Sequence, residues 1–469
     1  MTPAASPRRE PARRPVVAVV GGGLAGMAAA LDCADAGAAV TLFESRGALG
    51  GAAASQSRDG LTLDTGQHVF LRCCTAYRTF LERIGAASLT QLQERLEIDV
   101  VAPGGRSARL RRVALPAPLH LGPALARYRP LSRGERLAAA RAALAARRLD
   151  PDDPALDART LGDWLTEHGQ SERAVRRLWD LFVLSALNLR AADASLALAA
   201  TVLRTGLLER ADAGDIGLAR LPLSELHDRR AAAALLAAGV DVRLGARVTA
   251  IEPDGRGLRV ACPGGDLDAA AVVVAVPAQR AVGLVPGGAF ADPEALARLG
   301  SSPIVNVHVI YDRPVTGLAM AAAVDSPVQW VFDRSQASGV SGRQYLALSL
   351  SDATALIDRS ADELRAQFLP ALEELFPAAR QANVAWFGVT RARHATFRQA
   401  PGAQGTRPGA ATGVPGLYLA GAFTDTGWPA TMEGAVRSGH TAARLVLAGL
   451  AHAGPRSAVA ETTTEGSSR

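Results

Sequence analysis

Near the start of the chain, the apolar positions first follow a strand pattern and then a helix pattern. Residues 16–20 read VVAVV, an uninterrupted run typical of a strand that is buried on both faces. Gly21, Gly23 and Gly26 follow with the spacing G-x-G-x-x-G, and an alanine-rich helix is expected over residues 27–36. This order of strand, glycine turn and helix predicts a dinucleotide whose pyrophosphate lies at the helix N-terminus.

An acidic residue ends the next apolar run. Residues 40–43 predict a second strand, and Glu44 follows it about 18 residues after Gly26. A carboxylate there accepts hydrogen bonds from an unphosphorylated ribose, as in FAD or NAD. The alternative is a glycine-rich turn in some other βαβ unit, and Glu44 argues against it.

Residues 86–220 change to a helical pattern that is rich in Arg, Ala and Leu and is broken by prolines. A helix over residues 131–149, capped by Ser132, is expected to have a Leu/Ala side and an arginine side. The region reads either as a helical insertion with solvated arginines or as a basic, apolar face that rests on a membrane. Residues 115–131, which mix Leu, Pro, Tyr and Arg, are the candidate contact.

The last part of the chain returns to strand patterns. Alternation predicts antiparallel strands around one helix at 361–375, a sheet that floors a substrate cavity, with the strands at residues 304–311, 329–332, 344–350 and 383–389. Residues 417–421 then run into a glycine turn, and a helix is expected over 432–449. This second strand, turn and helix places another positive helix end near the cofactor.

Together these patterns predict an α/β fold with a Rossmann-like, discontinuous dinucleotide-binding domain. That domain is expected to comprise residues 15–88, 221–285 and 411–452. A helical insertion that caps the substrate is expected at 89–220, an antiparallel-sheet substrate domain at 286–410, a disordered arm at 1–14, and a disordered tail at 453–469.

The charged residues of the chain exclude several classes of cofactor and partner. The net charge is +6, and the chain has no Lys, which excludes a Schiff-base lysine or a P-loop lysine. No nucleic-acid-binding motif is present, so no nucleic-acid partner is expected, and an anionic membrane is a better partner for the surplus arginines. No apolar run reaches the ~20 residues that span a bilayer. We expect a cytoplasmic protein that contacts the inner face of the plasma membrane peripherally.

The four cysteines are Cys33, Cys73, Cys74 and Cys262, and they show no spacing typical of metal ligands. No metal is therefore expected. The vicinal pair Cys73–Cys74 is interpreted as core packing rather than as a redox centre. A reducing compartment fits this usage.

Two separated segments resemble a known family. VVGGGLAG at residues 19–26 and GLYLAGAFTDTGWPATMEGAVRSG at residues 416–439 resemble the flavin-dependent amine oxidase superfamily, which includes the phytoene desaturases. TMEGAVRSG, together with LDTGQHVF at residues 63–70, is most similar to the hydroxysqualene dehydroxylase family of bacterial squalene and hopanoid synthesis. The resemblance implies FAD, and no cysteine near the second segment is placed to bind it covalently.

The resemblance also implies which residues hold FAD. The pyrophosphate is expected at Gly21, Gly23, Leu24, Ala25 and Gly26; the adenosine at Glu44, Ser45, Arg46 and Val248; the phosphates and ribityl chain at Gly50 and Gly51; and the flavin ring at Gly66, Gln67, His68, Gly421, Ala422, Thr431, Met432 and Glu433. Two positions depart from the family pattern. Ala52 stands where many relatives have an arginine after Gly-Gly, and Ala422 stands where many have an aspartate.

The family's reaction converts hydroxysqualene to squalene and water at the expense of a reduced flavin. An alcohol of this kind ionises more readily when an acid protonates its oxygen, and a hydride then attacks the carbon. The candidate proton donors are His68, Asp425 and Glu433. Each also has a structural interpretation: His68 hydrogen-bonds within a turn, Asp425 caps a loop, and Glu433 interacts with the dipole of the last helix. A long apolar isoprenoid and an electron donor of open identity are the expected partners.

Three alternatives remain open at this stage. A carotenoid desaturase has similar motifs. An amine oxidase is disfavoured because such enzymes often carry a lysine near the flavin. A Rab escort-type protein that binds prenyl groups without flavin is disfavoured because Glu44 and TMEGAVRSG are intact.

Overall fold

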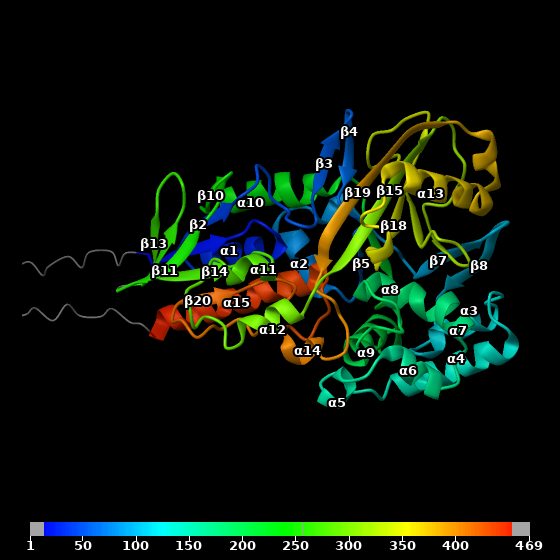
Figure 1. Ribbon diagram of the computed structural model, residues 1–469, viewed down its shortest axis with the longest axis horizontal. Helices are drawn as coiled ribbons and strands as arrows, with labels where there is room; N and C mark the ends of the chain where they lie inside the picture. Colours follow the sequence, from blue (N-terminus) through cyan, green and yellow to red (C-terminus); the bar gives the residue numbers. More distant parts are fainter. Residues whose placement is uncertain (1–13, 256, 453–469) are drawn as a thin grey trace, which may run out of the picture.

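The computed structural model describes residues 14–255 and 257–452 of the 469-residue chain. Apart from Arg14, the predicted arm and the predicted tail lie outside the described residues. The first sheet lies at one end of the long axis, and the second sheet and a helical layer lie at the other (Figure 1).

The first sheet has five parallel strands in the order β10-β2-β1-β14-β20. Their bounds are β1 (Val16–Val20), β2 (Ala39–Glu44), β10 (Asp241–Leu244), β14 (Ala271–Val274) and β20 (Leu417–Leu419). The chain leaves β1 toward β2 on one side, whereas β14 lies on the other. Ligands of open α/β sheets bind at the carboxyl ends of the strands at such a switch point. The predicted Rossmann-like α/β class is confirmed.

Both faces of β1 are buried, as its sequence predicts. Val17 and Val19 pack in the core that contains α1 (Leu24–Asp35) and α15 (Met432–His452). Ala18 and Val20 pack in the core of the opposite face. That face is covered by a three-stranded sheet of β11 (Ala250–Asp254), β12 (Gly257–Ala261) and β13 (Leu267–Ala269). The helices α10 (Ala231–Ala237) and α11 (Ala278–Val282) also belong to this part.

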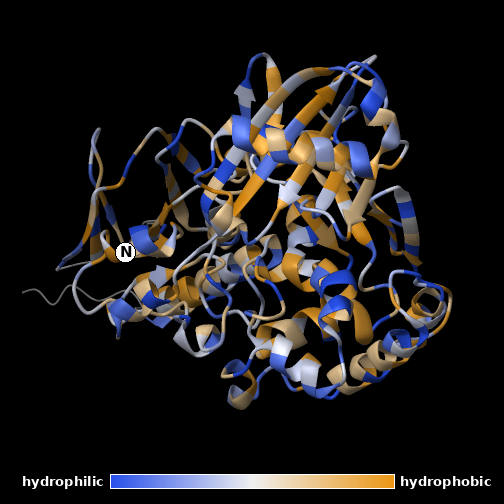
Figure 2. Ribbon diagram, turned by 45° about the vertical axis from the view of Figure 1, so that its right-hand side comes forward, coloured by the Kyte–Doolittle hydropathy of each residue, from blue (hydrophilic) through white to orange (hydrophobic). Residues whose placement is uncertain are grey.

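The second sheet has seven strands in the order β19-β15-β18-β17-β16-β7-β8. Their bounds are β7 (Glu97–Ala102), β8 (Gly105–Arg111), β15 (Ser302–Tyr311), β16 (Met320–Ala323), β17 (Trp330–Asp333), β18 (Gln344–Leu350) and β19 (Val384–Thr396). All neighbours are antiparallel except β16 and β7. The predicted helix at 361–375 is confirmed as α13 (Ala361–Leu375), whose Leu364, Phe368 and Leu372 belong to the core of this sheet. Hydrophobic and hydrophilic residues alternate along the helices and strands of the molecule (Figure 2).

Two strands of this sheet lie in the stretch that the sequence predicts to be helical. β7 buries Ile98 and Val100 on alternate positions and pairs with β8 as a hairpin. β8 contains Arg, Ala and Leu, the residues whose abundance led to the helical prediction for this stretch. The sheet therefore draws on residues 97–111 as well as on the segment after residue 286.

Helices do fill most of residues 119–208. They are α3 (Gly122–Ala126), α4 (Arg133–Ala146), α5 (Pro154–Asp157), α6 (Leu161–Glu167), α7 (Glu172–Ala174), α8 (Asp180–Leu187) and α9 (Leu196–Leu203), with π-helical turns at Val175–Trp179 and Arg204–Leu208. The predicted cap of α4 is confirmed, because Ser132 and Glu135 form a reciprocal capping box.

The elements that join these parts are short. They are β3 (Ser55–Arg58), β4 (Leu61–Asp64), β5 (Val69–Leu71), α2 (Thr75–Arg83), β6 (Thr90–Leu92), β9 (Ile216–Ala219), a π-helical turn at Glu225–Arg230, α12 (Pro293–Arg298) and α14 (Ala403–Thr406). Across the described residues, no helix combines the length and apolarity that a bilayer span requires.

Candidate functional site

The glycine turn after β1 has no room for side chains at two of its positions. Gly21 has φ +114°, and a Cβ there would lie 2.4 Å from the Ala275 carbonyl oxygen. A Cβ on Gly26 would lie 1.9 Å from the Gly21 carbonyl oxygen. Gly23 is the N-cap of α1 and supplies no side-chain acceptor. The amides of the first turn, which include those of Leu24 and Ala25, are therefore available to an anion.

Glu44 closes the turn from the end of β2. One carboxylate oxygen accepts a hydrogen bond from the Gly22 amide at 2.8 Å, and the other accepts from the Arg46 amide at 2.8 Å and the Ser45 hydroxyl at 3.2 Å. The side chain is buried. The carboxylate is thus fixed beside the glycine turn, where the sequence predicts the adenosine ribose.

The other residues predicted at the adenosine half lie around the same turn. The Gly50 amide donates to the Gly22 carbonyl at 2.9 Å, and a Cβ on Gly51 would lie 3.0 Å from the Gly23 Cα. The Arg46 guanidinium donates to the Gly51 carbonyl at 3.3 Å. The buried Val248 follows residue 246, whose amide donates to the Glu44 carbonyl at 2.9 Å.

The second strand, turn and helix come together at Gly421. This residue has φ +145°, and its amide donates to the Ser438 hydroxyl on α15 at 2.8 Å. The hydroxyl of Thr431 accepts from the Gly434 amide at 3.2 Å and so caps the start of α15. Met432, the first residue of α15, is half-buried against the core of the first sheet.

A buried arginine that the sequence analysis missed supports this turn. The Arg407 guanidinium donates to the carbonyls of Ala422, Phe423 and Thr424, and it lies 5.2 Å from the centre of the Phe397 ring. Burial lowers the pKa of Arg407 to about 10. The motif R-P was visible in the sequence, but nothing there connected it with a turn fifteen residues later.

Glu433, a predicted proton donor, is occupied by structural contacts. Its carboxylate accepts from the amides of Ala76 and Tyr77, at 3.1 and 2.8 Å, and from Arg437 at 2.7 Å. The side chain is 1% exposed. It therefore caps the N-terminus of α2 and fixes α2 against α15. These contacts favour the structural interpretation of Glu433.

Asp425, the second candidate donor, lies on the loop between Gly421 and α15 and is exposed to solvent. Its carboxylate accepts from the Gly427 amide at 3.2 Å, which is the loop cap that the sequence also allowed.

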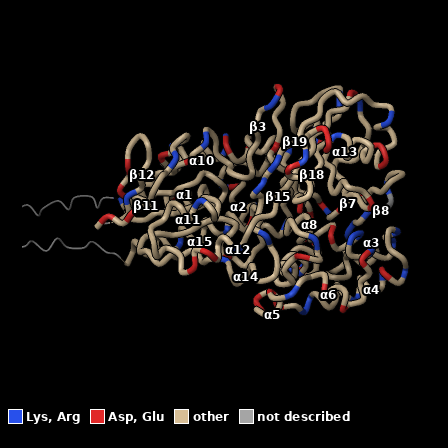
Figure 3. Tube along the Cα trace, in the orientation of Figure 1, with Lys and Arg blue, Asp and Glu red and all other residues tan. Residues whose placement is uncertain are grey.

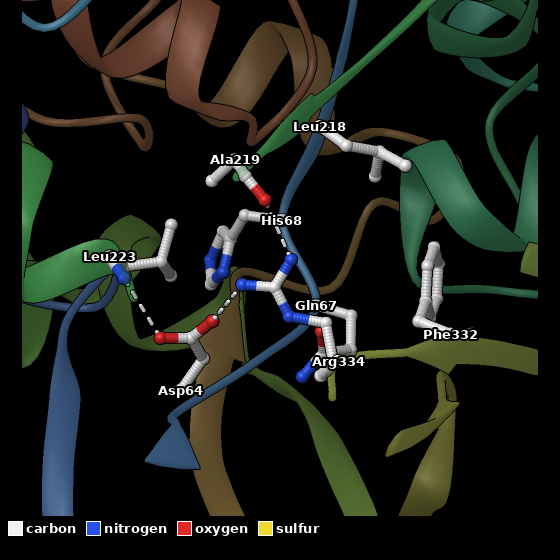
Figure 4. Close-up of a pocket in the computed structure, with 8 residues that line it drawn as sticks. All are labelled: Asp64, Gln67, His68, Leu218, Ala219, Leu223, Phe332 and Arg334. Carbon is white, nitrogen blue, oxygen red and sulfur yellow. Dashed lines mark hydrogen bonds and ion pairs between the residues drawn. The ribbon is translucent and has the colours of Figure 1, made fainter. Parts of the chain in front are cut away.

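His68, the third candidate, lines a cavity of about 10 Å³, enough for roughly one water. The other lining residues are Asp64, Gln67, Leu218, Ala219, Leu223, Phe332 and Arg334 (Figure 4). Its Nδ1 lies 3.0 Å from the Gly66 carbonyl oxygen. Because a carbonyl only accepts, Nδ1 carries a hydrogen there, which leaves Nε2 for another partner. Burial lowers the pKa of His68 below its usual 6.5.

An ion pair beside His68 was not predicted. Arg334 and Asp64 lie 2.9 Å apart and are 9% and 6% exposed at their side chains. Arg334 also donates to the carbonyls of Ala219 and Leu221. Asp64 also accepts from the Leu223 amide at 2.9 Å. The pair connects β4, which leads into the His68 turn, to the end of β17 in the second sheet.

Two buried polar atoms near the same turn have no hydrogen-bond partner among the described residues. They are the Nε2 donor of Gln67 and the Oδ1 acceptor of Asn306. The Asn306 amide nitrogen donates to the Thr65 carbonyl at 3.0 Å, which places this residue against the turn. Unpaired buried polar groups are rare in native proteins. Their presence here is what a site for a polar ligand requires.

The cysteines and other titratable groups suggest no second centre. All four cysteines are free, and within the described ranges no group of His, Cys, Asp and Glu is placed to hold a metal. The Cys74 thiol lowers the pKa of Cys73 through a hydrogen bond. The buried His227, whose pKa burial lowers to about 4, lies 2.9 Å from the Tyr77 hydroxyl and 2.7 Å from the Ala53 carbonyl oxygen.

Comparisons with known proteins agree with this geometry. The family model of the flavin containing amine oxidoreductases matches residues 24–447. Hydroxysqualene dehydroxylase of Rhodopseudomonas palustris is 32% identical over 92% of this chain and 98% of its own length. Zeta-carotene desaturase of Synechocystis is 25% identical over 92% of this chain and 97% of its own.

Solved structures show the same fold. Cyclohexylamine oxidase from Brevibacterium oxydans superposes with a TM-score of 0.71 at 20% identity, covering 94% of this chain and 100% of the other. With the match over nearly the whole chain and the two glycine turns in place, the chain is a flavin-dependent oxidoreductase that belongs to the flavin containing amine oxidoreductase family and groups there with the hydroxysqualene dehydroxylases.

Proposed function

We propose that this enzyme reductively removes the hydroxyl group of hydroxysqualene to give squalene, in squalene and hopanoid synthesis. The observation that carries the proposal is the identity of 32% to a hydroxysqualene dehydroxylase over 92% of the chain. In the reaction, the C–O bond breaks, the oxygen takes a proton and leaves as water, and the carbon receives a hydride. Two electrons and two protons are consumed in total.

We propose FAD, held without a covalent bond, as the flavin. The fit rests on the first-turn amides of α1 for the pyrophosphate, on Glu44 for the ribose, and on the unpaired donor of Gln67 and acceptor of Asn306, since a flavin ring edge offers both acceptors and a donor. Reduced FAD supplies the hydride when it is bound.

Among the three candidates we propose His68 as the proton donor. In the neutral ring, Nδ1–H is bound to the Gly66 carbonyl, so the transferable proton is the one that Nε2 carries in the imidazolium form. The lowered pKa makes that imidazolium a stronger acid than an exposed histidine.

Several finer points belong to the same proposal. The substrate is a long apolar isoprenoid, the enzyme contacts the inner face of the plasma membrane from the cytoplasm, and a separate donor reduces the flavin. The second candidate function is carotenoid desaturation, which the similarity to zeta-carotene desaturase favours.

Product analysis distinguishes these functions. The purified holoenzyme, reduced with dithionite without oxygen, would be given hydroxysqualene, presqualene diphosphate and phytoene in parallel. We expect squalene from hydroxysqualene alone. Recovery of unchanged hydroxysqualene, together with desaturation of phytoene by the oxidised enzyme, would replace the proposal by the second candidate.

Gly26→Ala is expected to raise the dissociation constant of FAD at least tenfold. The new Cβ would meet the Gly21 carbonyl oxygen at 1.9 Å and force the pyrophosphate turn open. Gly47→Ala is the matched control, because no atom lies within 4 Å of a Cβ at this exposed position. Flavin absorbance after dialysis measures retention, and equal retention by both variants would contradict the pyrophosphate assignment.

A further inference from the structure

A cleft of about 240 Å³ lies between β8 and α3, and none of its lining residues is acidic. It is lined by Arg95, Arg109, Arg111, Arg112, Val113, Pro123, Ala124 and Arg127. Its volume suits a phosphate-sized group rather than a whole lipid or an isoprenoid. Five guanidinium groups around one cleft repel one another unless an anion joins them.

The charges of this cleft are only partly balanced by the protein. Arg112 pairs with the buried Asp215 at 2.6 Å. Arg109 and Arg111 share Glu97, at 3.2 and 3.1 Å, and Arg109 also pairs with Asp99 at 3.0 Å. Arg95 and Arg127 are exposed, and neither has a carboxylate within 4.0 Å among the described residues. Two guanidinium groups are thus free for an outside anion, and guanidinium forks bind phosphate oxygens well.

Two exposed leucines lie on the segment that joins two lining residues of the cleft. Leu115 and Leu119 are 44% and 59% exposed, and both lie on the segment that connects the lining residues Val113 and Pro123. A large apolar side chain held in water beside a cationic cleft fits a surface that is apolar and anionic at once. A small soluble anion would use the arginines but not these leucines.

Helix α4 repeats the same combination. It buries alanines, namely Ala138, Ala139, Ala142 and Ala146, and turns larger residues outward. Leu137 and Leu144 are 59% and 52% exposed. The exposed Arg133 and Arg141 fall on the same stripe as these leucines, at spacings of three and four residues, and the exposed Arg148 follows the end of the helix. The sequence placed leucine and alanine on one side, whereas the structure separates them and leaves leucine with arginine outside.

The cleft and α4 belong to one end of the molecule. α3 contacts both β8 and α4, and the Arg136 guanidinium at the start of α4 donates to the Ala126 carbonyl at the end of α3. In Figure 3, β8, α3 and α4 lie at the end of the molecule away from α1, and they carry basic positions with acidic ones among them. We call the cleft with Leu115, Leu119 and the outer stripe of α4 the arginine–leucine surface.

We propose that the arginine–leucine surface docks on a bilayer of anionic phospholipids, with a headgroup phosphate in the cleft and the leucines among the acyl chains near the interface. The inference deepens the proposed membrane contact by naming the surface and its lipid chemistry. It is independent of the reaction, because vesicle binding is measured without substrate. Cationic residues add electrostatic attraction to the burial of the leucines.

Sedimentation of the holoenzyme with vesicles tests the proposal. Vesicles of phosphatidylcholine alone are compared with vesicles that also contain phosphatidylglycerol. The double variant R95Q/R127Q is expected to bind anionic vesicles roughly 30-fold more weakly than the unchanged protein. The double variant L115S/L119S is expected to bind both vesicle types more weakly. Flavin content and melting temperature confirm that each variant is folded.

The control variants are R230Q/R280Q and Leu236→Ser. Arg230 and Arg280 are exposed, and Leu236 is 76% exposed, but all three belong to the part of the chain around the first sheet. These variants are expected to bind as the unchanged protein does. Equal binding to both vesicle types, or undiminished binding by R95Q/R127Q, would overturn the proposal. If inorganic pyrophosphate binds the unchanged protein but not R95Q/R127Q, while both proteins bind anionic vesicles equally, the cleft is assigned to a soluble anion instead.

Discussion

Arg334→Met is expected to lower the free energy of unfolding by about 3–5 kcal/mol, because it leaves the Asp64 carboxylate buried and unpaired. Asp64 is 6% exposed, and without Arg334 its carboxylate keeps hydrogen bonds from the Leu223 amide and the Ser55 hydroxyl but loses the ion pair that balances its charge. Methionine keeps much of the length of the side chain, so lost packing contributes little. Equilibrium urea unfolding of the holoenzyme measures the change.

The double variant D64N/R334M separates charge from packing. Asparagine still offers an oxygen to the Leu223 amide but brings no charge into the interior. More than half of the lost stability is expected to return. If the double variant is as unstable as the sum of the two single variants, the pair acts through packing and hydrogen bonds rather than through its charges.

Arg243→Met is the matched control for an exposed ion pair. Arg243 pairs with Asp241 at 2.8 Å, but the two side chains are 39% and 54% exposed. Exposed pairs contribute little because water screens them. The midpoint of unfolding is expected to stay within the error of the measurement.

Local patterns predicted the parts of this fold that local physics determines. The run VVAVV, the glycine turn and Glu44 needed only a few neighbours in sequence, and they lie in the structure as predicted. The capping box of Ser132 is another case, because its partner is three residues away. In each case the residues that fix the geometry lie within about one element of each other.

The parts that escaped prediction depend on distant partners. Arg334 and Asp64 are 270 residues apart in the chain, and nothing in the sequence around either residue indicates that they form a pair. Glu433 reaches α2 across 356 residues, so an acid at a helix start could not be told from a catalytic one by sequence. Periodicity also treats alanine and leucine alike as apolar, although only tertiary packing decides which faces the core.

His68→Gln is expected to lower kcat for squalene formation by about 10²–10⁴-fold, the range typical of general acid catalysis. Glutamine can still donate to the Gly66 carbonyl, so the turn should persist, but it cannot deliver a proton. Single turnovers of the reduced holoenzyme measure the rate, and flavin content is checked first because His68 lies where the ring is expected.

The pH profile identifies the donor. Only the imidazolium form of His68 carries the proton on Nε2, and burial lowers its pKa below 6.5. The donor form is therefore lost as pH rises through that lowered pKa, and the rate should fall about tenfold per pH unit above it. His68→Gln should abolish this slope. A variant that keeps the slope would show that another group supplies the proton.

Two further variants distinguish His68 from Asp425 as the proton donor. Asp425→Asn is expected to change kcat by less than about threefold, because the carboxylate is exposed and only caps a loop. His394→Gln, at an exposed position on β19, controls for the loss of a histidine. If Asp425→Asn lowers kcat as much as His68→Gln does, the proton donor is on the loop before α15. The buried cavity of Figure 4 then serves to hold the flavin edge rather than to move the proton.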